Sequence, residues 1–164
     1  MPDDWIRQWG DPALREVAAP VAALDDLLRR RVQRMADLLL EADGAGLAAT
    51  QVGVLRRLFV FRETREAPVG VLVNPRVVSA SGEQAAFEEG CLSFMAVTVA
   101  VRRPVAVRVE AVDLEGRELT IDAEGGLASL MQHEIDHLDG ILTLDRADPG
   151  ERRRALSVLL AEAA

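Results

Sequence analysis

The amino-acid sequence predicts an α+β fold in a single domain that spans residues 1–164. Three observations lead to this prediction: a long amphipathic pattern over residues 23–42, a series of short β-branched segments after it, and helical patterns near the C-terminus. Helices and strands grouped in this way favour an antiparallel sheet with helices against it over alternating βαβ units. The length of 164 residues fits one domain, and we find neither an internal repeat nor a linker.

Composition narrows the classes of function that the chain can have. Its net charge of −8 argues against a broad surface for nucleic acid or for anionic membranes. No apolar run approaches the ~20 residues of a membrane-spanning helix, and residues 1–10 lack the pattern of a secretion signal. Cys91 is the only cysteine, so an intrachain disulfide is impossible. A cytoplasmic location is therefore expected.

The first 22 residues are expected to be irregular, because prolines and a glycine recur in them. From Ala23 to Ala42, apolar residues recur at steps of three and four and predict one helix. These apolar residues are Leu24, Leu27, Leu28, Val32, Met35, Leu38 and Leu39. Asp25 and Asp26 suit its first turn, since carboxylates stabilise the N-terminal end of a helix dipole. Gly44 suits its end.

Short segments rich in β-branched residues predict the strands. They are residues 58–61, 69–73, 77–78, 97–101, 105–112 and 118–121. Residues 105–112 alternate apolar with small or charged residues, as a half-buried antiparallel strand does, and residues 114–117 predict a hairpin turn. Two further helices are predicted: residues 126–138, ending at Gly140, and residues 149–161, with Pro149 in the first turn.

The segment 132–140 carries the strongest functional signal. His133 and His137 are the only histidines and are four residues apart, which on a helix places both imidazoles on one face. Two imidazoles in that arrangement can bind one metal ion, and Glu134 can act as general base on a water at that ion. The alternative is an exposed amphipathic helix whose histidines have no ligand role.

A catalytic metal site needs a third protein ligand and an open fourth position. The segment 132–140 lacks the further histidine or glutamate that marks the better-known metalloproteases. Cys91 is the best candidate, since Gly90 before it permits a tight turn. A single cysteine is otherwise often a small buried apolar residue, and that alternative stays open here.

The segment 44–51, Gly-Ala-Gly-Leu-Ala-Ala-Thr-Gln, has small side chains that leave its backbone accessible. Such a backbone suits a peptide that pairs with it as an added strand. The amide of Gln51 can donate a hydrogen bond to a carbonyl oxygen that develops negative charge. A helix end followed by a turn is the alternative interpretation, and no Lys-Ser or Lys-Thr follows to suggest a phosphate loop.

Taken together, these segments resemble the three signature motifs of the peptide deformylases, in the family's order and at similar separations. The motifs are Gly44-x-Gly46-Leu47-Ala48-Ala49-x-Gln51, Glu89-Gly90-Cys91-Leu92-Ser93 and Gln132-His133-Glu134-x-Asp136-His137-Leu138-x-Gly140. Residues 10–15 also match a common opening of the family. The resemblance therefore covers nearly the whole chain.

The resemblance implies a fold in which antiparallel sheets surround the helix that carries both histidines, with another helix toward each end of the chain. It implies that Cys91, His133 and His137 bind one divalent metal ion. In the family this ion is usually Fe²⁺ in cells, although Zn²⁺, Ni²⁺ or Co²⁺ can occupy the site. A thiolate with two imidazoles does not by itself select iron over zinc.

The resemblance also implies the catalytic roles. Glu134 would deprotonate the attacking water and return a proton to the departing amine, while Gln51 and the backbone N–H of Leu92 would stabilise the tetrahedral oxyanion. The residues implied to align the substrate peptide are Gly46, Leu47 and Gly90. Glu89 is implied to pair with Arg103 and so to fix the second motif; an ordinary surface salt bridge is the alternative.

The implied reaction is hydrolysis of the N-formyl group from the N-terminal formyl-methionine of nascent polypeptides, with release of formate. The implied protein is a monomer without direct nucleic-acid specificity. Near the C-terminus, Arg152 to Arg154 are either a solvated helix face or a docking site for the ribosome near its exit tunnel.

The chain departs from the family pattern after Ser93. Met95 and Ala96 replace a frequent Pro-Gly, Thr98 stands roughly where an arginine holds the substrate backbone, and Gly126 replaces a common bulky aromatic residue. The departures put substrate contacts and efficiency in question but leave the metal ligands intact. Two rival functions follow: hydrolysis of another N-acyl peptide or small amide, and metal binding or scaffolding without catalysis.

Overall fold

The computed structural model describes residues 5–164; Met1 to Asp4, the start of the segment predicted to be irregular, lie outside the described residues. The helices are α1 (Asp26–Glu41), α2 (Gly125–Leu138), α3 (Thr143–Arg146) and α4 (Pro149–Ala163). The strands are β1 (Gly46–Ala48), β2 (Leu58–Phe61), β3 (Gly70–Ala80), β4 (Gln84–Glu89), β5 (Val99–Pro104), β6 (Ala106–Val112) and β7 (Glu118–Glu124). Two 3₁₀ turns are η1 (Pro12–Arg15) and η2 (Ala49–Val52).

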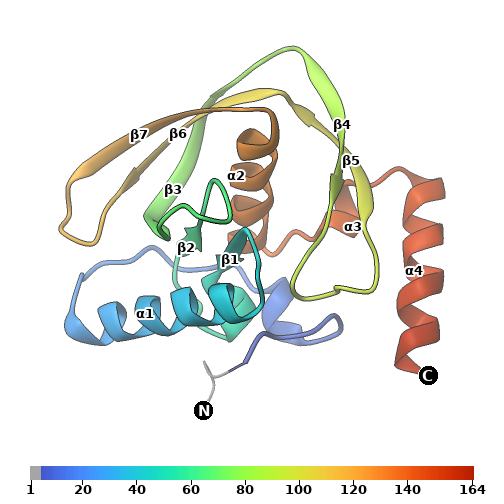
Figure 1. Ribbon diagram of the computed structural model, residues 1–164, viewed down its shortest axis with the longest axis horizontal. Coiled ribbons are helices and arrows are strands. Elements are labelled where there is room, and N and C mark those ends of the chain that lie inside the picture. Colours follow the sequence, from blue (N-terminus) through green and yellow to red (C-terminus); the bar gives the residue numbers. More distant parts are fainter. Residues whose placement is uncertain (1–4) are drawn as a thin grey trace.

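Antiparallel sheets and helices make up the fold, which confirms the predicted α+β class. The larger sheet has five strands in the order β1-β2-β3-β6-β7, and β4 pairs with β5 in a separate two-stranded ribbon. Every one of these pairings is antiparallel. In Figure 1 this ribbon lies to the right of α2 and faces α4 at the edge of the molecule.

The two long central helices cover opposite faces of the larger sheet. Phe59 and Phe61 of β2 belong to the apolar cluster with α2, whereas Leu58 and Val60 belong to the cluster with α1. Since successive side chains of a strand point to opposite faces, α1 and α2 lie on either side of β2 (Figure 1). This explains why all four residues of β2 are buried.

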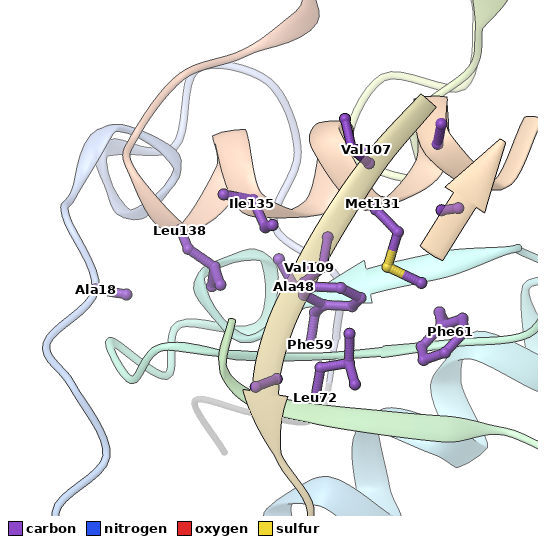
Figure 2. Packing of buried hydrophobic residues seen from close by; sticks show 13 residues of the cluster. Ala18, Ala48, Phe59, Phe61, Leu72, Val107, Val109, Met131, Ile135 and Leu138 are labelled. Carbon is purple, nitrogen blue, oxygen red and sulfur yellow. The ribbon is translucent and has the colours of Figure 1, made fainter. Parts of the chain in front are cut away.

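The core between α2 and the sheet fixes the helix that carries both histidines. Met131, Ile135 and Leu138 project from α2 toward the strands, where Phe59 and Leu72 lie (Figure 2). Burying an apolar side chain of this size contributes about 1.5–3 kcal/mol. The histidines stand two residues after Met131 and Ile135, and two residues turn an α-helix by about 200°. They therefore project from the other side of α2.

The loop between β4 and β5 is held by a third apolar cluster. Cys91, Phe94 and Val97 of this loop pack with Leu144 of α3 and Leu159 of α4. The C-terminal helices thus have a packing role beside the loop that carries the predicted cysteine ligand.

Helix α1 is shorter than the predicted helix 23–42, because both of its ends are capped inside that range. Asp25 is the N-cap, and its Oδ1 accepts the backbone N–H of Leu28 at 2.8 Å. At the other end Asp43, rather than Gly44, adopts the left-handed conformation with φ 52°. The N–H groups of both residues donate to carbonyls of the last turn. Leu27, predicted on the apolar face, is 50% exposed.

The sequence does not predict β1, β4 or α3. β1 consists of Gly, Leu and Ala, and the Gln-Ala-Ala-Phe-Glu-Glu of β4 favours a helix; pairing with β5 makes it a strand. The predicted strands 69–73 and 77–78 form one strand, β3, which passes Asn74 and Pro75 through a register shift. β5 spans residues 99–104 instead of 97–101, and β7 continues to Glu124.

Other boundaries agree with the sequence. Gly140 follows α2 with φ 71°, and a Cβ there would lie 2.5 Å from the carbonyl oxygen of Arg15, so this position requires glycine. β6 and β7 form the predicted hairpin around the left-handed Gly116. α4 runs to Ala163, two residues beyond its predicted end at position 161. Within residues 5–164 no helix is long and apolar enough to cross a membrane.

Candidate active site

Cys91, His133 and His137 converge on one point. The two histidines lie one turn apart on α2, and their Nε2 atoms are 3.2 Å apart. The Sγ of Cys91 lies 3.3 Å from the Nε2 of His137. One ligand atom from each of the three residues lies within 4.8 Å of the others, and all three residues are buried. The structure therefore brings together the three residues that the sequence indicates as metal ligands.

These separations suit a divalent metal ion. With nitrogen ligands at about 2.05 Å and sulfur at about 2.3 Å, a tetrahedral site places two nitrogens about 3.3 Å apart and nitrogen about 3.6 Å from sulfur. The observed 3.2 Å and 3.3 Å are close to these values. Three protein ligands also leave a fourth position for a water molecule or a substrate. The donor set fits a catalytic metal.

Glu89 fixes the orientation of His133. Its Oε1 lies 2.8 Å from Nδ1 of His133, which leaves Nε2 of that ring for the metal side. Arg103 donates to both carboxylate oxygens of Glu89, and both residues are buried. Burial alone would raise the pKa of Glu89, but hydrogen bonds and charge from Arg103 and His133 lower it to about 2. Glu89 is therefore an anion at neutral pH.

The ion-pair network extends beyond the residues that the sequence indicates. Arg103 also donates to Asp136 at 2.9 Å, and Asp136 accepts from Arg146 of α3. Ser129 donates to Glu89 at 3.1 Å. Ser129 stands four residues before the first histidine, so the i, i+4 neighbourhood on a helix is a signal that could have found it. Arg146 has no such signal, because tertiary packing brings α3 to this place.

The two histidines have opposite electrostatic surroundings. Burial disfavours the charged form of both rings. At His133, hydrogen bonds with Cys91 and Glu89 outweigh burial and raise its pKa well above the usual 6.5. At His137, burial and the positive charges of His133 and Arg103 lower the pKa well below that value. These surroundings favour a proton on His133 rather than on His137.

Glu134 is a second buried carboxylate beside this point. Its Oε1 lies against the backbone of Gly46, where an added Cβ would be 2.4 Å away. Its Oε2 is buried and has no hydrogen-bond partner within residues 5–164. Burial raises the pKa of Glu134 from 4.5 to about 7. This carboxylate can therefore take up and release a proton near neutral pH.

Gln51, in the turn η2 that directly follows β1, has its amide nitrogen toward the cysteine. Its Oε1 accepts the backbone N–H of Ala48 at 2.9 Å. Because a backbone N–H can only donate, this bond fixes which amide atom is the oxygen. Nε2 then donates to Oγ of Ser93 at 3.0 Å and lies 3.6 Å from Sγ of Cys91. An N–H donor group thus lies beside the metal ligand Cys91.

A cleft of about 400 Å³ opens at these residues. Residues 42–46, residues 88–92 with Met95, Gln51 and one face of α2 line it. Gly46, Gly90 and Leu92, which are expected to act on the substrate, are among the lining residues. Leu47 is fully buried in the core between α1 and the sheet and is not among them.

Two of the residues that depart from the family pattern, Met95 and Gly126, line this cleft. Met95 lines it and is 69% exposed. Gly126 also lines it, and a Cβ added there would meet nothing within 4 Å. Thr98 lies elsewhere, with its carbonyl oxygen accepting a hydrogen bond from Arg154 at 2.6 Å. Among the described residues that line the cleft, none is an arginine.

A buried cysteine and two histidines converge in an open cleft, beside a carboxylate with a pKa near neutral pH. These features are those of a mononuclear metallohydrolase. The family model of the polypeptide deformylases matches residues 3–153. A peptide deformylase of Rhizobium meliloti is 47% identical over 139 residues, which are 82% of this chain and 79% of the relative. A peptide deformylase of Parafrankia sp. is 43% identical over 94% of this chain and 84% of the relative.

Solved structures lead to the same family. The peptide deformylase from Legionella pneumophila superposes with a TM-score of 0.91 at 39% identity, over 97% of this chain and 94% of that one. The enzyme from Synechococcus elongatus, solved in complex with actinonin, superposes with a TM-score of 0.91 at 37% identity, over 99% and 89%. The chain belongs to the polypeptide deformylase family.

Proposed function

We propose that this chain hydrolyses the N-formyl group of N-terminal formyl-methionine in polypeptides, giving formate and a free amine. One observation carries the proposal: Glu134, with a buried carboxylate oxygen that has no partner among residues 5–164, lies in one cleft with Cys91, His133 and Gln51. A proton acceptor, a metal-binding donor set and an N–H donor are thus available to one scissile amide. Family membership supplies the reaction class.

Cys91, His133 and His137 would hold the metal ion. When bound, a divalent ion lowers the pKa of a water molecule toward about 7, which makes hydroxide available at neutral pH. We propose Fe²⁺ as the ion in cells, with Zn²⁺, Ni²⁺ or Co²⁺ as replacements, since thiolate and imidazole ligands bind all of these ions.

Glu134 would carry the proton through the reaction. Its pKa of about 7 allows the carboxylate to accept a proton from the attacking water and then to give it to the departing amine. Its Oε1 packs on Gly46 of β1, and both residues line the cleft with Cys91 and His133. A substrate held at β1 would therefore present its amide nitrogen on the side where the proton is stored.

The oxyanion of the tetrahedral intermediate would be stabilised by Gln51 and by the backbone N–H of Leu92. The Nε2 of Gln51 already points at the metal side, because its Oε1 is occupied by Ala48. A donor of this kind supplies ~3–4 kcal/mol of transition-state stabilisation in other hydrolases.

The free edge of β1 would bind the peptide backbone. The backbone N–H of Arg62 donates to the carbonyl of Ala45 at 2.9 Å, and in an antiparallel ladder hydrogen-bonded pairs alternate with non-bonded pairs. The next pair, Gly46 with Phe61, is therefore a non-bonded pair. The N–H and C=O of Gly46 face the free edge, where a formyl-methionyl peptide can add as a strand.

In the cell we propose a cytoplasmic monomer that acts on nascent chains, with docking to the ribosome through α4. Arg152 lies 3.7 Å from Asp145, and Arg154 pairs with Glu151, so these two arginines also have partners inside the chain. The test is co-sedimentation of the protein with ribosomes. Arg153→Glu should reduce it, and absence of binding by the parent protein would end the docking proposal.

The test of the reaction is formate release from formyl-Met-Ala-Ser and acetyl-Met-Ala-Ser by protein loaded with Fe²⁺ or Ni²⁺ without oxygen. We expect release of formate from the formyl peptide and no cleavage of the acetyl peptide. Cys91→Ala is the control, because a folded protein without the sulfur ligand should bind little metal and release little formate.

Either rival function would give a different result. Comparable cleavage of both peptides would indicate an amidohydrolase of broader N-acyl specificity, in line with the open space at Gly126. No cleavage of either peptide by a folded, metal-loaded parent would sink the proposed reaction and favour a metal-binding protein without catalysis.

A further inference from the structure

Arg62 is a buried arginine outside the metal centre whose side chain reaches the turn that lines the cleft. It directly follows β2 and is 7% exposed. Arginine is seldom buried unless its charge and its donors find partners. The partners of Arg62 lie in the turn between α1 and β1 and in the loop after β2.

The guanidinium holds that turn with two hydrogen bonds and the following loop with a third. Nη2 donates to Oδ1 of Asp43 at 2.6 Å, and Nε donates to the carbonyl oxygen of Gly44 at 2.7 Å. Nη1 donates to the carbonyl oxygen of Arg65 at 2.8 Å, and the backbone N–H donates to Ala45 at 2.9 Å. A planar guanidinium fixes these directions, whereas an ammonium group does not. Residues 43–45 are thus bound to the end of β2.

The turn has an unfavourable conformation of its own. Asp43 has φ 52°, a left-handed conformation that costs energy for a residue other than glycine. Gly44 is closely packed, since an added Cβ would lie 2.7 Å from a methyl group of Leu92, whose side chain would have to shift. Residues 42–46 all line the cleft, and the turn leads straight into β1. Besides the pairing of β1 with β2, Arg62 supplies side-chain contacts that hold this turn from outside it.

We propose that Arg62 is a positioning residue for the peptide part of the substrate. It holds the free edge of β1 where the backbone beyond the formyl-methionine can pair with it. The inference rests on the proposed function and adds a residue that contacts neither the metal ligands nor the scissile amide. Without the guanidinium, the turn would occupy several positions, and only a fraction of the molecules would present an edge competent to bind a peptide.

A purely structural ion pair is the rival explanation, and the chain offers a matched control for it. Arg65 binds the same carboxylate, with its Nε 2.9 Å from Oδ1 of Asp43, but its side chain is 71% exposed. If the charge on Asp43 were all that mattered, loss of either arginine would have a similar effect. If the hydrogen bond from Arg62 to the carbonyl of Gly44 matters, only the loss of Arg62 would weaken binding of the substrate peptide.

The experiment compares Arg62→Met, Arg62→Lys and Arg65→Met with the metal-loaded parent on two substrates. Formyl-Met-Ala-Ser has a backbone to pair with β1, whereas formyl-methionine has no residue beyond the first. For Arg62→Met we expect KM for the tripeptide to rise about 10-fold. A rise of this size corresponds to a β1 edge that can bind the peptide in about a tenth of the molecules. Its kcat and its KM for formyl-methionine should stay near the parent values. Arg62→Lys should not restore the tripeptide KM, and Arg65→Met should resemble the parent.

Several results would overturn the inference. A similar rise in KM for both substrates, or an equal effect of Arg65→Met, would leave Arg62 with a structural role only. If Arg62→Met does not fold, Arg62→Lys keeps the charge and carries the same two-substrate comparison. If the parent releases formate from neither substrate, the proposed function fails and the inference fails with it. If the parent is active but the effect of the Arg62 variants on KM is the same for both substrates, the proposed function stands and only the inference fails.

Discussion

Two buried carboxylates lie beside His133, and their surroundings differ. Glu89 accepts hydrogen bonds from His133, Arg103 and Ser129, whereas Oε2 of Glu134 has no partner in the described part of the chain. Their exposed fractions are 6% and 2%. Burial raises the pKa of Glu134 to about 7, whereas at Glu89 its effect is outweighed by the partners, which bring the pKa to about 2.

Burial alone therefore does not decide the protonation of these two carboxylates; their hydrogen-bond and charge partners do. A carboxylate that stays ionised can orient a metal ligand at every pH of interest, whereas one that titrates near pH 7 can exchange protons with a substrate. We therefore propose a structural role for Glu89 and a chemical role for Glu134.

Glu134→Gln should remove proton transfer by Glu134 and leave the orientation of His133 by Glu89 unchanged. Glutamine has the same size but cannot take up and return a proton, so kcat for formyl-Met-Ala-Ser should fall about 10²–10⁴-fold. Metal content and melting temperature should not fall, because Oε2 of Glu134 has no hydrogen-bond partner within residues 5–164 that the change would remove. Glu124→Gln, at the exposed N-cap of α2, is the control and should keep full activity. Unchanged kcat in Glu134→Gln would remove Glu134 from the chemistry.

Arg103→Met should destabilise the buried ion-pair network around Glu89. The change leaves Glu89 and Asp136, both buried, without the guanidinium that they share. Removal of one partner from a buried ion pair usually costs about 3–5 kcal/mol of unfolding free energy, which urea unfolding of the metal-free protein can measure. Arg108→Met is the matched control, because its ion pair with Asp122 is exposed. Equal losses in the two variants would mean that burial of the network contributes nothing special.

The pH dependence of stability also differs between the two carboxylates, because their contributions to the unfolding free energy change with pH in opposite directions. The pKa of Glu89 is lowered from 4.5 to about 2, so its contribution is present above pH 4.5 and is lost as the pH falls toward 2. The pKa of Glu134 is raised from 4.5 to about 7, so its contribution is present below pH 4.5 and is lost as the pH rises through 7.

The metal-free parent should therefore lose stability relative to metal-free Glu134→Gln as the pH rises through this range. The rise in the pKa of Glu134 from 4.5 to about 7 corresponds to about 3 kcal/mol of unfolding free energy. Urea unfolding of both proteins at a series of pH values measures the difference directly. A difference that stays constant from below pH 4.5 to above pH 7 would show that Glu134 titrates as an ordinary exposed carboxylate.

The features predicted correctly from the sequence are those set by residues close together in the chain. The end of α2 depends on Gly140, which alone tolerates the left-handed turn against Arg15. The shared point of His133 and His137 follows from a four-residue spacing on a helix. The hairpin of β6 and β7 follows from an alternating pattern and a glycine turn.

Features that depend on distant residues were not predictable in the same way. β4 has a helix-favouring composition and is a strand because β5 pairs with it. Arg62 meets Gly44, and Arg146 meets Asp136, through tertiary packing that no spacing rule describes. The opposite pKa directions of the two glutamates also depend on burial and neighbours, which a single sequence does not reveal.

Glu89→Gln is the smallest change, and it separates orientation from charge. Glutamine keeps an oxygen that can accept a hydrogen bond from Nδ1 of His133 but lacks the anion that Arg103 binds. Loss of such an outer partner usually weakens metal binding about 10–100-fold, which competition with a chelator can measure. Glu88→Gln makes the same change of charge one residue away, at an exposed position on the cleft, and should leave metal affinity unchanged.

Metal saturation then distinguishes the two carboxylates. Because Glu89 orients a ligand and takes no proton from the substrate, Glu89→Gln should recover a kcat close to that of the parent once enough metal is present. Glu134→Gln should not recover at any metal concentration, since its defect is the missing proton acceptor. If saturating metal fails to restore Glu89→Gln, the fixed anion contributes to the chemical step as well, and the separation of roles drawn from the two environments is wrong.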